Sequence, residues 1–181
     1  HNGYPGNLKL HACYELDNEN TLRYSLEAVS DKLTIFNPVN HTYFNLGDRA
    51  ENLDLQMNAD YYLPVDKTGL PDRGMEEVKG TAFDAQIKLR NGLDHPFILN
   101  GNLPNAVLSS NKHKLTVTTN APALVLYAGN HFDHTGIPDN IGQYDGLTFE
   151  AQCPPAEGND LGQITLLPNE KFRRTVNWKF E

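Results

Sequence analysis

The sequence predicts an all-β protein, built as a sandwich or barrel of short antiparallel strands. Apolar and polar residues alternate with a period of two along much of the chain, which is typical of strands with one buried face. No window of eleven or more residues has the i, i+3, i+4, i+7 apolar pattern of an amphipathic helix. The 14 glycines and 11 prolines are spread along the chain and oppose long helices. Short strands between frequent turn signals are typical of sandwiches and barrels.

The expected strands follow one another with turn residues between them. Residues 8–16 alternate as a half-buried strand, residues 17–20 form a turn cluster, and residues 22–28 resume the alternation, which predicts a hairpin. No repeat, low-complexity tract or linker interrupts the chain, so we expect one domain over residues 1–181. Further strands are expected over residues 33–37, 53–58, 114–119, 123–128, 147–152, 163–167 and 172–180.

Composition and charge exclude several classes of partner. Fifteen Lys plus Arg against 23 Asp plus Glu leave a formal charge of −8, which disfavours nucleic acid and anionic membranes as partners. The longest apolar stretches, such as residues 123–127, fall far short of the ~20 residues of a membrane helix. The chain shows no secretion leader, and Cys13 and Cys153 make no disulfide framework, so a cytoplasmic protein is expected.

One stretch, Asn37–Leu46, holds a histidine among asparagine and aromatic residues. Pro38 excludes a central strand there, so His41 is expected at the rim of a polar pocket. A histidine can give or take a proton near neutral pH. The alternative is a hydrogen-bonded histidine at a strand end, with no role in function.

Two carboxylates also occupy informative positions. Asp94 lies in a Gly-Leu-Asp-His-Pro stretch and could accept hydrogen bonds from ligand hydroxyls, but the residues alone favour an ordinary turn. In residues 147–152, alternation places Thr148, Glu150 and Gln152 on one face and the apolar residues on the other. Partial burial in a cleft wall would suit Glu150 to act as a base, whereas on an open strand face it would only be a solvated charge.

The sequence contains no clear motif for a metal site, a nucleotide-binding loop or a serine nucleophile. His131 and His134 resemble a metal pair, but the seven histidines are scattered and each cysteine stands alone, so no metal site is expected. The glycine-rich nucleotide loops and the serine nucleophile elbow are absent from the sequence.

The segment Asn40–Leu46, Asn-His-Thr-Tyr-Phe-Asn-Leu, resembles the Asn-His-Ser/Thr-Tyr-Phe-Asn-Leu signature of the aldose 1-epimerases, or galactose mutarotases. Other blocks follow in the order found in that family, and the resemblance runs through the whole chain. These blocks are Gly3–Gly6, Tyr62–Asp66, Gly80–Asp84, Gly92–His95, Tyr127–Asn130 and Phe149–Gln152.

The resemblance implies a large antiparallel β-sandwich of the galactose mutarotase type and a reaction on galactose or glucose that uses no cofactor. It implies that Glu150 is the general base on the sugar's C1 hydroxyl and that His41 is the general acid on the ring oxygen, on opposite sides of the hemiacetal. Asp94 corresponds to the acidic residue that holds sugar hydroxyls. Asn130 and Gln152 are expected to assist as neutral hydrogen-bond partners.

The chain departs from the family in two ways. The usual Glu-Thr-Gln triplet has Ala151 at its centre, a position that faces away from the expected cleft. Family members are also nearly twice as long, so the resemblance implies that this chain matches their C-terminal portion and lacks a second histidine and an arginine. Self-association or pairing with a missing N-terminal half is therefore an expectation, because exposed strand edges and apolar faces invite it.

Two other functions compete with mutarotation of a free sugar. A hexose-phosphate mutarotase would require clustered Arg or Lys near the pocket, and the arginines of this chain are scattered. A non-catalytic carbohydrate-binding or regulatory module would keep the pocket without turnover.

Overall fold

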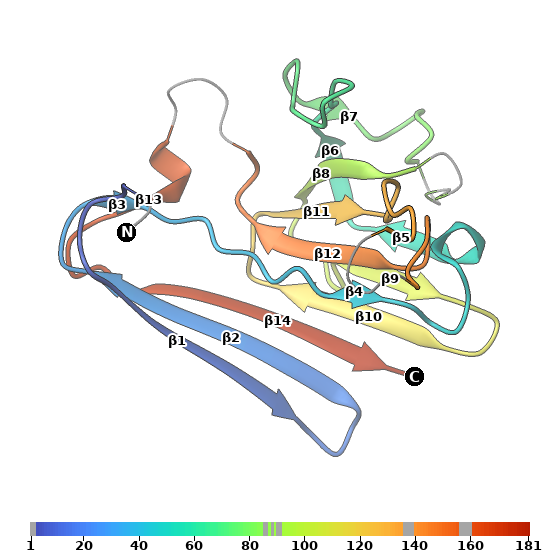
Figure 1. Cartoon of the computed structure of the whole chain (residues 1–181), viewed down its shortest axis with the longest axis horizontal. Coiled ribbons are helices and arrows are strands. Elements are labelled where there is room, and N and C mark those ends of the chain that lie inside the picture. Colours follow the sequence, from blue (N-terminus) through green and yellow to red (C-terminus); the bar gives the residue numbers. More distant parts are fainter. Residues whose placement is uncertain (1–2, 85–86, 88, 90–91, 136–139, 156–160) are drawn as a thin grey trace.

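The computed structural model describes residues 3–84, 87, 89, 92–135, 140–155 and 161–181, and it is a sandwich of antiparallel sheets (Figure 1). The first sheet has six strands. In spatial order they are β1 (Leu8–Leu16), β2 (Thr21–Ser30), β14 (Phe172–Phe180), β10 (Lys114–Thr119), β9 (Ala106–Ser109) and β5 (Asp54–Met57).

The second sheet also has six strands and packs over one end of the first (Figure 1). Its spatial order is β4 (Tyr43–Phe44), β12 (Leu147–Gln152), β11 (Ala123–Tyr127), β8 (Asp94–Leu99), β6 (Ala59–Tyr62) and β7 (Glu76–Glu77). A small third sheet pairs β3 (Thr34–Ile35) with β13 (Thr165–Leu166). The helical elements whose bounds the structure describes are two short 3-10 turns, Ala50–Asn52 and Gly162–Ile164. The all-β prediction is confirmed.

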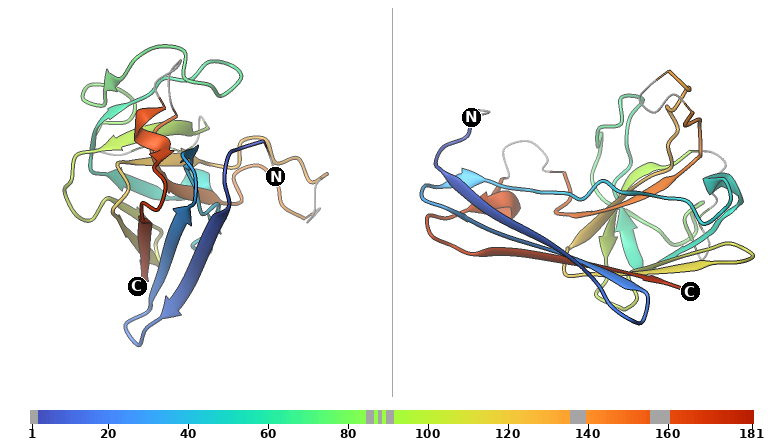
Figure 2. Two further views of the ribbon diagram at one scale, coloured as in Figure 1. Left: turned by 90° about the vertical axis from the view of Figure 1, so that its left-hand side faces the viewer. Right: turned by 60° about the horizontal axis from the view of Figure 1, so that its bottom comes forward.

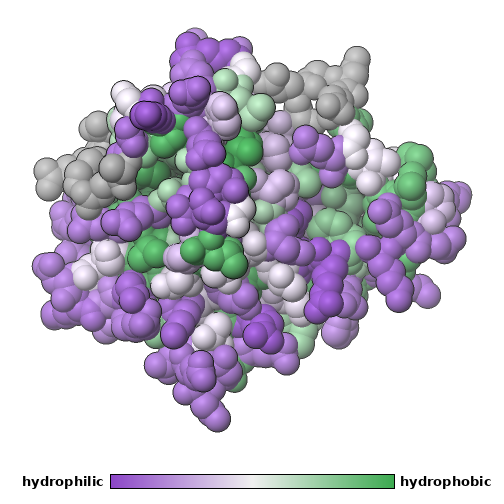
Figure 3. Space-filling model, turned by 180° about the vertical axis from the view of Figure 1, so that it is seen from behind, coloured by the Kyte–Doolittle hydropathy of each residue, from purple (hydrophilic) through white to green (hydrophobic). Residues whose placement is uncertain are grey.

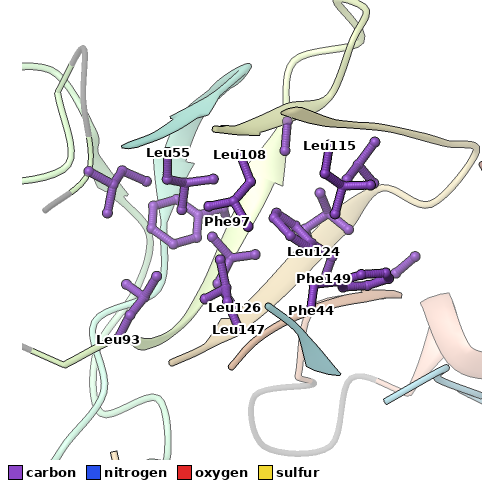
Figure 4. Packing of buried hydrophobic residues seen from close by; sticks show 14 of the residues in the cluster. Phe44, Leu55, Leu93, Phe97, Leu108, Leu115, Leu124, Leu126, Leu147 and Phe149 are labelled. Carbon is purple, nitrogen blue, oxygen red and sulfur yellow. The ribbon is translucent and has the colours of Figure 1, made fainter. Parts of the chain in front are cut away.

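The core lies between the two large sheets (Figure 4). Phe97, Leu124 and Phe149 project from the second sheet, and Leu108 and Leu115 meet them from the first. Each of these side chains is essentially inaccessible to solvent, and burying one stabilises the fold by about 1.5–3 kcal/mol. The sequence predicted β10, β11 and β12, which supply Leu115, Leu124 and Phe149, but it did not predict β8 and β9, which supply Phe97 and Leu108.

The sequence missed strand β8 because it contains a proline. Pro96 pairs with Val125 of β11, and the ladder to β6 reaches only Phe97, which pairs with Tyr62. Pro96 has no N–H to donate, but its nitrogen lies past the last residue of β8 that pairs with β6. The sheet therefore loses no hydrogen bond at this proline. Asp94 consequently opens a strand of the central sheet rather than lying in a turn, as the local sequence suggested.

The hairpin of β1 and β2 agrees with its predicted position, but the prediction that residues 8–16 form a half-buried strand was wrong. Leu10 is 57% exposed and Leu16 is 73% exposed, although both lie on the face that β2 buries. Figure 2 shows the reason: the hairpin projects beyond the second sheet, so no second layer lies over β1. Alternation identifies a face that can be buried, and here no described segment covers it.

Candidate active site

The candidate site lies on the face of the second sheet that points away from the core. Strand register places four residues side by side in one row across β4, β12, β11 and β8. The residues in this row are Tyr43, Thr148, Tyr127 and Asp94. Glu150 stands on the same face, two positions further along β12 than Thr148, because side chains two apart on a strand share a face. The alternation predicted this face for Thr148, Glu150 and Gln152.

Glu150 is buried and held by its neighbours. Only 8% of the residue is exposed, and its Oε1 accepts a 3.0 Å hydrogen bond from the Thr148 hydroxyl. Its Oε2 accepts a 3.4 Å hydrogen bond from Gln152 Nε2. Burial raises the pKa of Glu150, while the charge of His41 and the bond from Thr148 lower it, and Asp94 raises it further. The net upward direction suits a carboxylate that exchanges protons.

His41 contacts Glu150 directly. His41 Nε2 lies 2.9 Å from Glu150 Oε1, and the histidine side chain is 48% exposed. The ring of His41 lies 5.1 Å from the ring of Tyr43. His41 precedes the edge strand β4, as the position of Pro38 predicted, so its segment crosses the rim of the sheet and reaches over β12. The structure therefore brings together two residues that lie far apart in the sequence.

Asp94 faces the same site from β8. Burial raises the pKa of its carboxyl, and the charges of His131 and His41 lower it. A Cβ built on Gly69 would lie 3.4 Å from Asp94 Oδ2, so the 66–70 turn lies against this carboxylate. The adjacent His95 occupies the opposite face of β8, where burial lowers its pKa among aromatic rings.

Asn130 and Gln152 both have their side-chain amides engaged within the protein. Asn130 Oδ1 accepts from the backbone N–H of Leu93 at 3.2 Å, and its Nδ2 donates to the Leu93 carbonyl at 3.1 Å. These bonds fix the chain immediately before Asp94. Gln152 accepts a 3.3 Å bond from Asn37 and donates to Glu150. Gln152 therefore holds the Glu150 carboxylate directly, whereas Asn130 holds the backbone of Leu93, next to Asp94.

Aromatic side chains complete the site, although the sequence did not indicate them as site residues. The rings of Tyr43, Tyr127 and Phe132 lie 5.1 to 6.3 Å from one another. Burial raises the pKa of Tyr43 to about 12, so its phenol keeps its proton. The signal was present, because Tyr43 lies inside the Asn40–Leu46 motif and Tyr127 opens another of the matching blocks.

Three further findings concern metal binding, membrane helices and the cysteines. Across the described ranges, no three His, Cys, Asp or Glu side chains gather as they would around a metal ion. Within the same ranges, no helix has both the length and the hydrophobicity needed to cross a membrane. Cys13 and Cys153 are free thiols.

Fold and site together define a β-sandwich protein of the galactose mutarotase type. The model of the family described as aldose 1-epimerase matches residues 1–179, and the chain belongs to this family. It is 33% identical to an aldose 1-epimerase of Haemophilus influenzae, over 87% of this chain and 53% of that protein. It is also 33% identical to the human galactose mutarotase, over 98% of this chain and 59% of that protein.

Solved structures agree with this assignment. The crystal structure of galactose 1-epimerase from Lactobacillus acidophilus superposes with a TM-score of 0.93 and 79% identity, covering 99% of this chain and 59% of that chain. An aldose epimerase homologue from Caenorhabditis elegans superposes with a TM-score of 0.88 and 25% identity, over 99% of this chain and 61% of that chain. The chain therefore spans between half and about three fifths of the length of these relatives.

Proposed function

We propose that this chain interconverts the α and β anomers of an aldohexose, galactose or glucose, by acid–base opening and closing of the sugar ring. The observation that carries the proposal is the 2.9 Å contact between His41 Nε2 and the buried carboxylate of Glu150. Anomerisation near neutral pH needs one group that takes a proton and another that gives one. A histidine and a glutamate with a raised pKa meet that need.

In the forward reaction the Glu150 carboxylate takes the proton from the C1 hydroxyl, and the His41 imidazolium gives its Nε2 proton to the ring oxygen. The bond between C1 and the ring oxygen breaks, and the open-chain aldehyde forms. Rotation about C1–C2 presents the other face of the carbonyl. On closure, neutral His41 takes the proton from the former ring oxygen, and Glu150 returns its proton to the C1 oxygen. Both residues are restored, and no co-reactant is consumed.

The direct His41–Glu150 bond must open for a hemiacetal to lie between these groups. Glu150 is held by Thr148 and Gln152, whereas the side chain of His41 is about half exposed. His41 is therefore the residue that moves. A displacement of His41 would place the two groups on opposite sides of the sugar.

The neighbouring side chains suit a sugar in this position. Asp94 stands one row away on the same face as Glu150 and can accept hydrogen bonds from sugar hydroxyls. The rings of Tyr43 and Tyr127 offer apolar surface to sugar C–H groups, and such a mixture of aromatic lining and few polar groups is typical of small-molecule sites. The Lactobacillus acidophilus and human relatives are named for galactose, which favours galactose over glucose as the substrate.

Polarimetry of freshly dissolved α-D-galactose, set against the spontaneous rate, tests the proposal. Acceleration that saturates with sugar concentration is the expected result, and a parallel series with α-D-glucose ranks the two sugars. Folded protein that binds galactose without accelerating its mutarotation would instead be a carbohydrate-binding module. Folded protein that neither binds nor accelerates would overturn both functions.

A further inference from the structure

Arg174, on β14, is a buried cation with an unused hydrogen-bond donor. Hydrophilic residues dominate the face of the molecule that is seen from behind in Figure 3, as is usual for charged and polar side chains. Arg174 differs, because only 6% of the residue is exposed and it is the one buried Lys or Arg among the described residues. Its Nε–H is inaccessible to solvent and has no hydrogen-bond partner in the described part of the chain. A buried donor without a partner is costly, so this group requires an acceptor.

The groups around Arg174 include a cysteine in the place where a carboxylate is usual. The central carbon of the guanidinium lies 5.4 Å from the ring centroid of Phe172, and this ring packs edge-on against Phe36 at 5.0 Å. An aromatic face attracts a cation but accepts no strong hydrogen bond. Burial lowers the pKa of Arg174, while the charge of Cys153 and a hydrogen bond with its side chain raise it. The polar group that faces the guanidinium is therefore the sulfur of Cys153.

Cys153 directly follows β12 and is held in place by its neighbours. Its backbone N–H donates a 2.9 Å hydrogen bond to Asn37 Oδ1, and its carbonyl accepts a 3.1 Å bond from Asn37 Nδ2. Its sulfur donates a 3.4 Å bond to the carbonyl of Gln163. The thiol is free and only half-buried, so small molecules can reach it. These contacts fix an accessible sulfur beside a buried positive charge.

This arrangement suits oxidation of the sulfur. The thiolate is the form of cysteine that attacks peroxides, and a positive charge beside the sulfur stabilises it. Arginine keeps its charge throughout the physiological pH range. Oxidation adds an oxygen atom to the sulfur, and this oxygen is the acceptor that the unused Nε–H of Arg174 lacks. The same guanidinium thus favours the reaction and stabilises its product.

We propose that Cys153 is an oxidation site, at which a hydroperoxide converts the thiol to a sulfenic acid that the Arg174 guanidinium holds. The thiolate attacks one oxygen of hydrogen peroxide, an S–O bond forms and the O–O bond breaks. The sulfur loses two electrons to the peroxide, and the leaving hydroxide takes up the proton that the thiol released, which gives water. A small thiol then forms a mixed disulfide with Cys153 and releases water, and a second small thiol frees Cys153. This chemistry is independent of the sugar chemistry proposed above.

The test compares the two cysteines of the folded chain, because Cys13 serves as an internal control. Cys13 is also free and half-buried, and its register partner on β2 is the uncharged Ser25. The protein is treated with hydrogen peroxide in the presence of dimedone, which traps sulfenic acids, and the adduct on each cysteine is quantified by peptide mass spectrometry. We expect Cys153 to be labelled at least about tenfold faster than Cys13 in the folded protein. In denaturing urea the two rates should converge, because the guanidinium is no longer held beside the sulfur.

Arg174→Met removes the charge, keeps an unbranched side chain, and should slow labelling of Cys153 at least about tenfold without changing that of Cys13. The matched control is Arg173→Met, on the opposite face of β14, where the arginine side chain is 67% exposed, and it should leave both rates unchanged. Circular dichroism checks that each variant folds. If Arg174→Met does not fold, the parent's rates in buffer and in urea decide. Equal labelling of the two cysteines in the folded parent, or parental labelling of Cys153 in folded Arg174→Met, overturns the proposal.

Discussion

The side-chain amide of Asn40 donates a 2.5 Å hydrogen bond to the phenol oxygen of Tyr14, and this bond joins the exposed face of β1 to the segment that carries His41. The side-chain oxygen of Asn40, Oδ1, accepts a second hydrogen bond, 2.6 Å long, from the Thr42 hydroxyl. His41 therefore lies between two tethered neighbours. The ring of Tyr14 packs on Tyr24, 4.9 Å away, so the anchor itself depends on the order of the β1–β2 hairpin.

Tyr14→Phe should slow mutarotation by loosening His41. The variant keeps the ring contact with Tyr24 and removes only the hydroxyl, at a cost of about 1 kcal/mol for one hydrogen bond. We expect kcat to fall about fivefold with KM unchanged, measured by polarimetry over a range of galactose concentrations. Tyr61→Phe, which removes a hydroxyl from an exposed tyrosine on β6, serves as the control. Parent-like kcat in Tyr14→Phe would show that this bond does not position His41.

Glu150→Gln should abolish turnover and preserve the fold. Glutamine keeps the size of the side chain and can still accept the Thr148 hydrogen bond, but it cannot take a proton. We expect the polarimetric rate to fall by at least about 10²-fold, the usual contribution of a positioned base. An unchanged melting temperature confirms that the loss is chemical. A variant that interconverts anomers as fast as the parent would remove Glu150 from the role of base.

Thr148→Val should move the pH dependence of the reaction. The Thr148 hydrogen bond lowers the pKa of Glu150, so its removal raises a pKa that burial already holds above the ordinary value. The base is then deprotonated only at higher pH, and the acid limb of the kcat/KM profile shifts upward. Thr148→Ser retains the hydroxyl and should leave the limb in place. If the acid limb of the kcat/KM profile of Thr148→Val lies at the same pH as in the parent, a group other than Glu150 controls it.

The same variant carries a stability cost. Thr148 Oγ1 also accepts a 3.2 Å hydrogen bond from the half-buried backbone N–H of Tyr127, so valine removes this bond as well as the one to Glu150. We expect the loss of these two hydrogen bonds to lower the free energy of unfolding by about 1–3 kcal/mol. Because the pH profile is measured on folded protein, this loss does not mimic a shift of the acid limb.

The sequence predicted several strands that carry the core, such as β10 and β12, and the face on which Glu150 stands, because period-two alternation indicates both a strand and its buried face. It could not predict that Glu150 is buried, since its cover comes from the His41 segment, more than a hundred residues away in the chain. Nor could it predict that the apolar face of β1 is open, because alternation does not show whether a second layer exists. The position of Asp94 was hidden by Pro96, which reads locally as a strand breaker and lies just beyond the β6 ladder.

Asp94→Ala should weaken sugar binding and have little effect on the chemical step. Its carboxylate stands on the site face and accepts hydrogen bonds but lies outside the His41–Glu150 pair. We expect KM for galactose to rise about tenfold, which corresponds to about 1.4 kcal/mol, with a smaller change in kcat. Asn130→Ala removes the two bonds that hold Leu93 and should raise KM less, by displacing Asp94. Unaltered saturation in Asp94→Ala would leave this residue a purely structural role.

His41→Asn should cut turnover sharply while keeping a hydrogen-bonding side chain beside Glu150. Asparagine can donate to the carboxylate, as His41 does across 2.9 Å, but it cannot exchange a proton near neutral pH. We expect kcat to fall by about 10²–10³-fold, within the range for loss of a general acid, with KM for galactose changed far less. His11→Asn makes the same exchange at an exposed position of β1, away from the site, and should match the parent. Equal rates in His41→Asn and His11→Asn would show that the proton on the ring oxygen comes from another group.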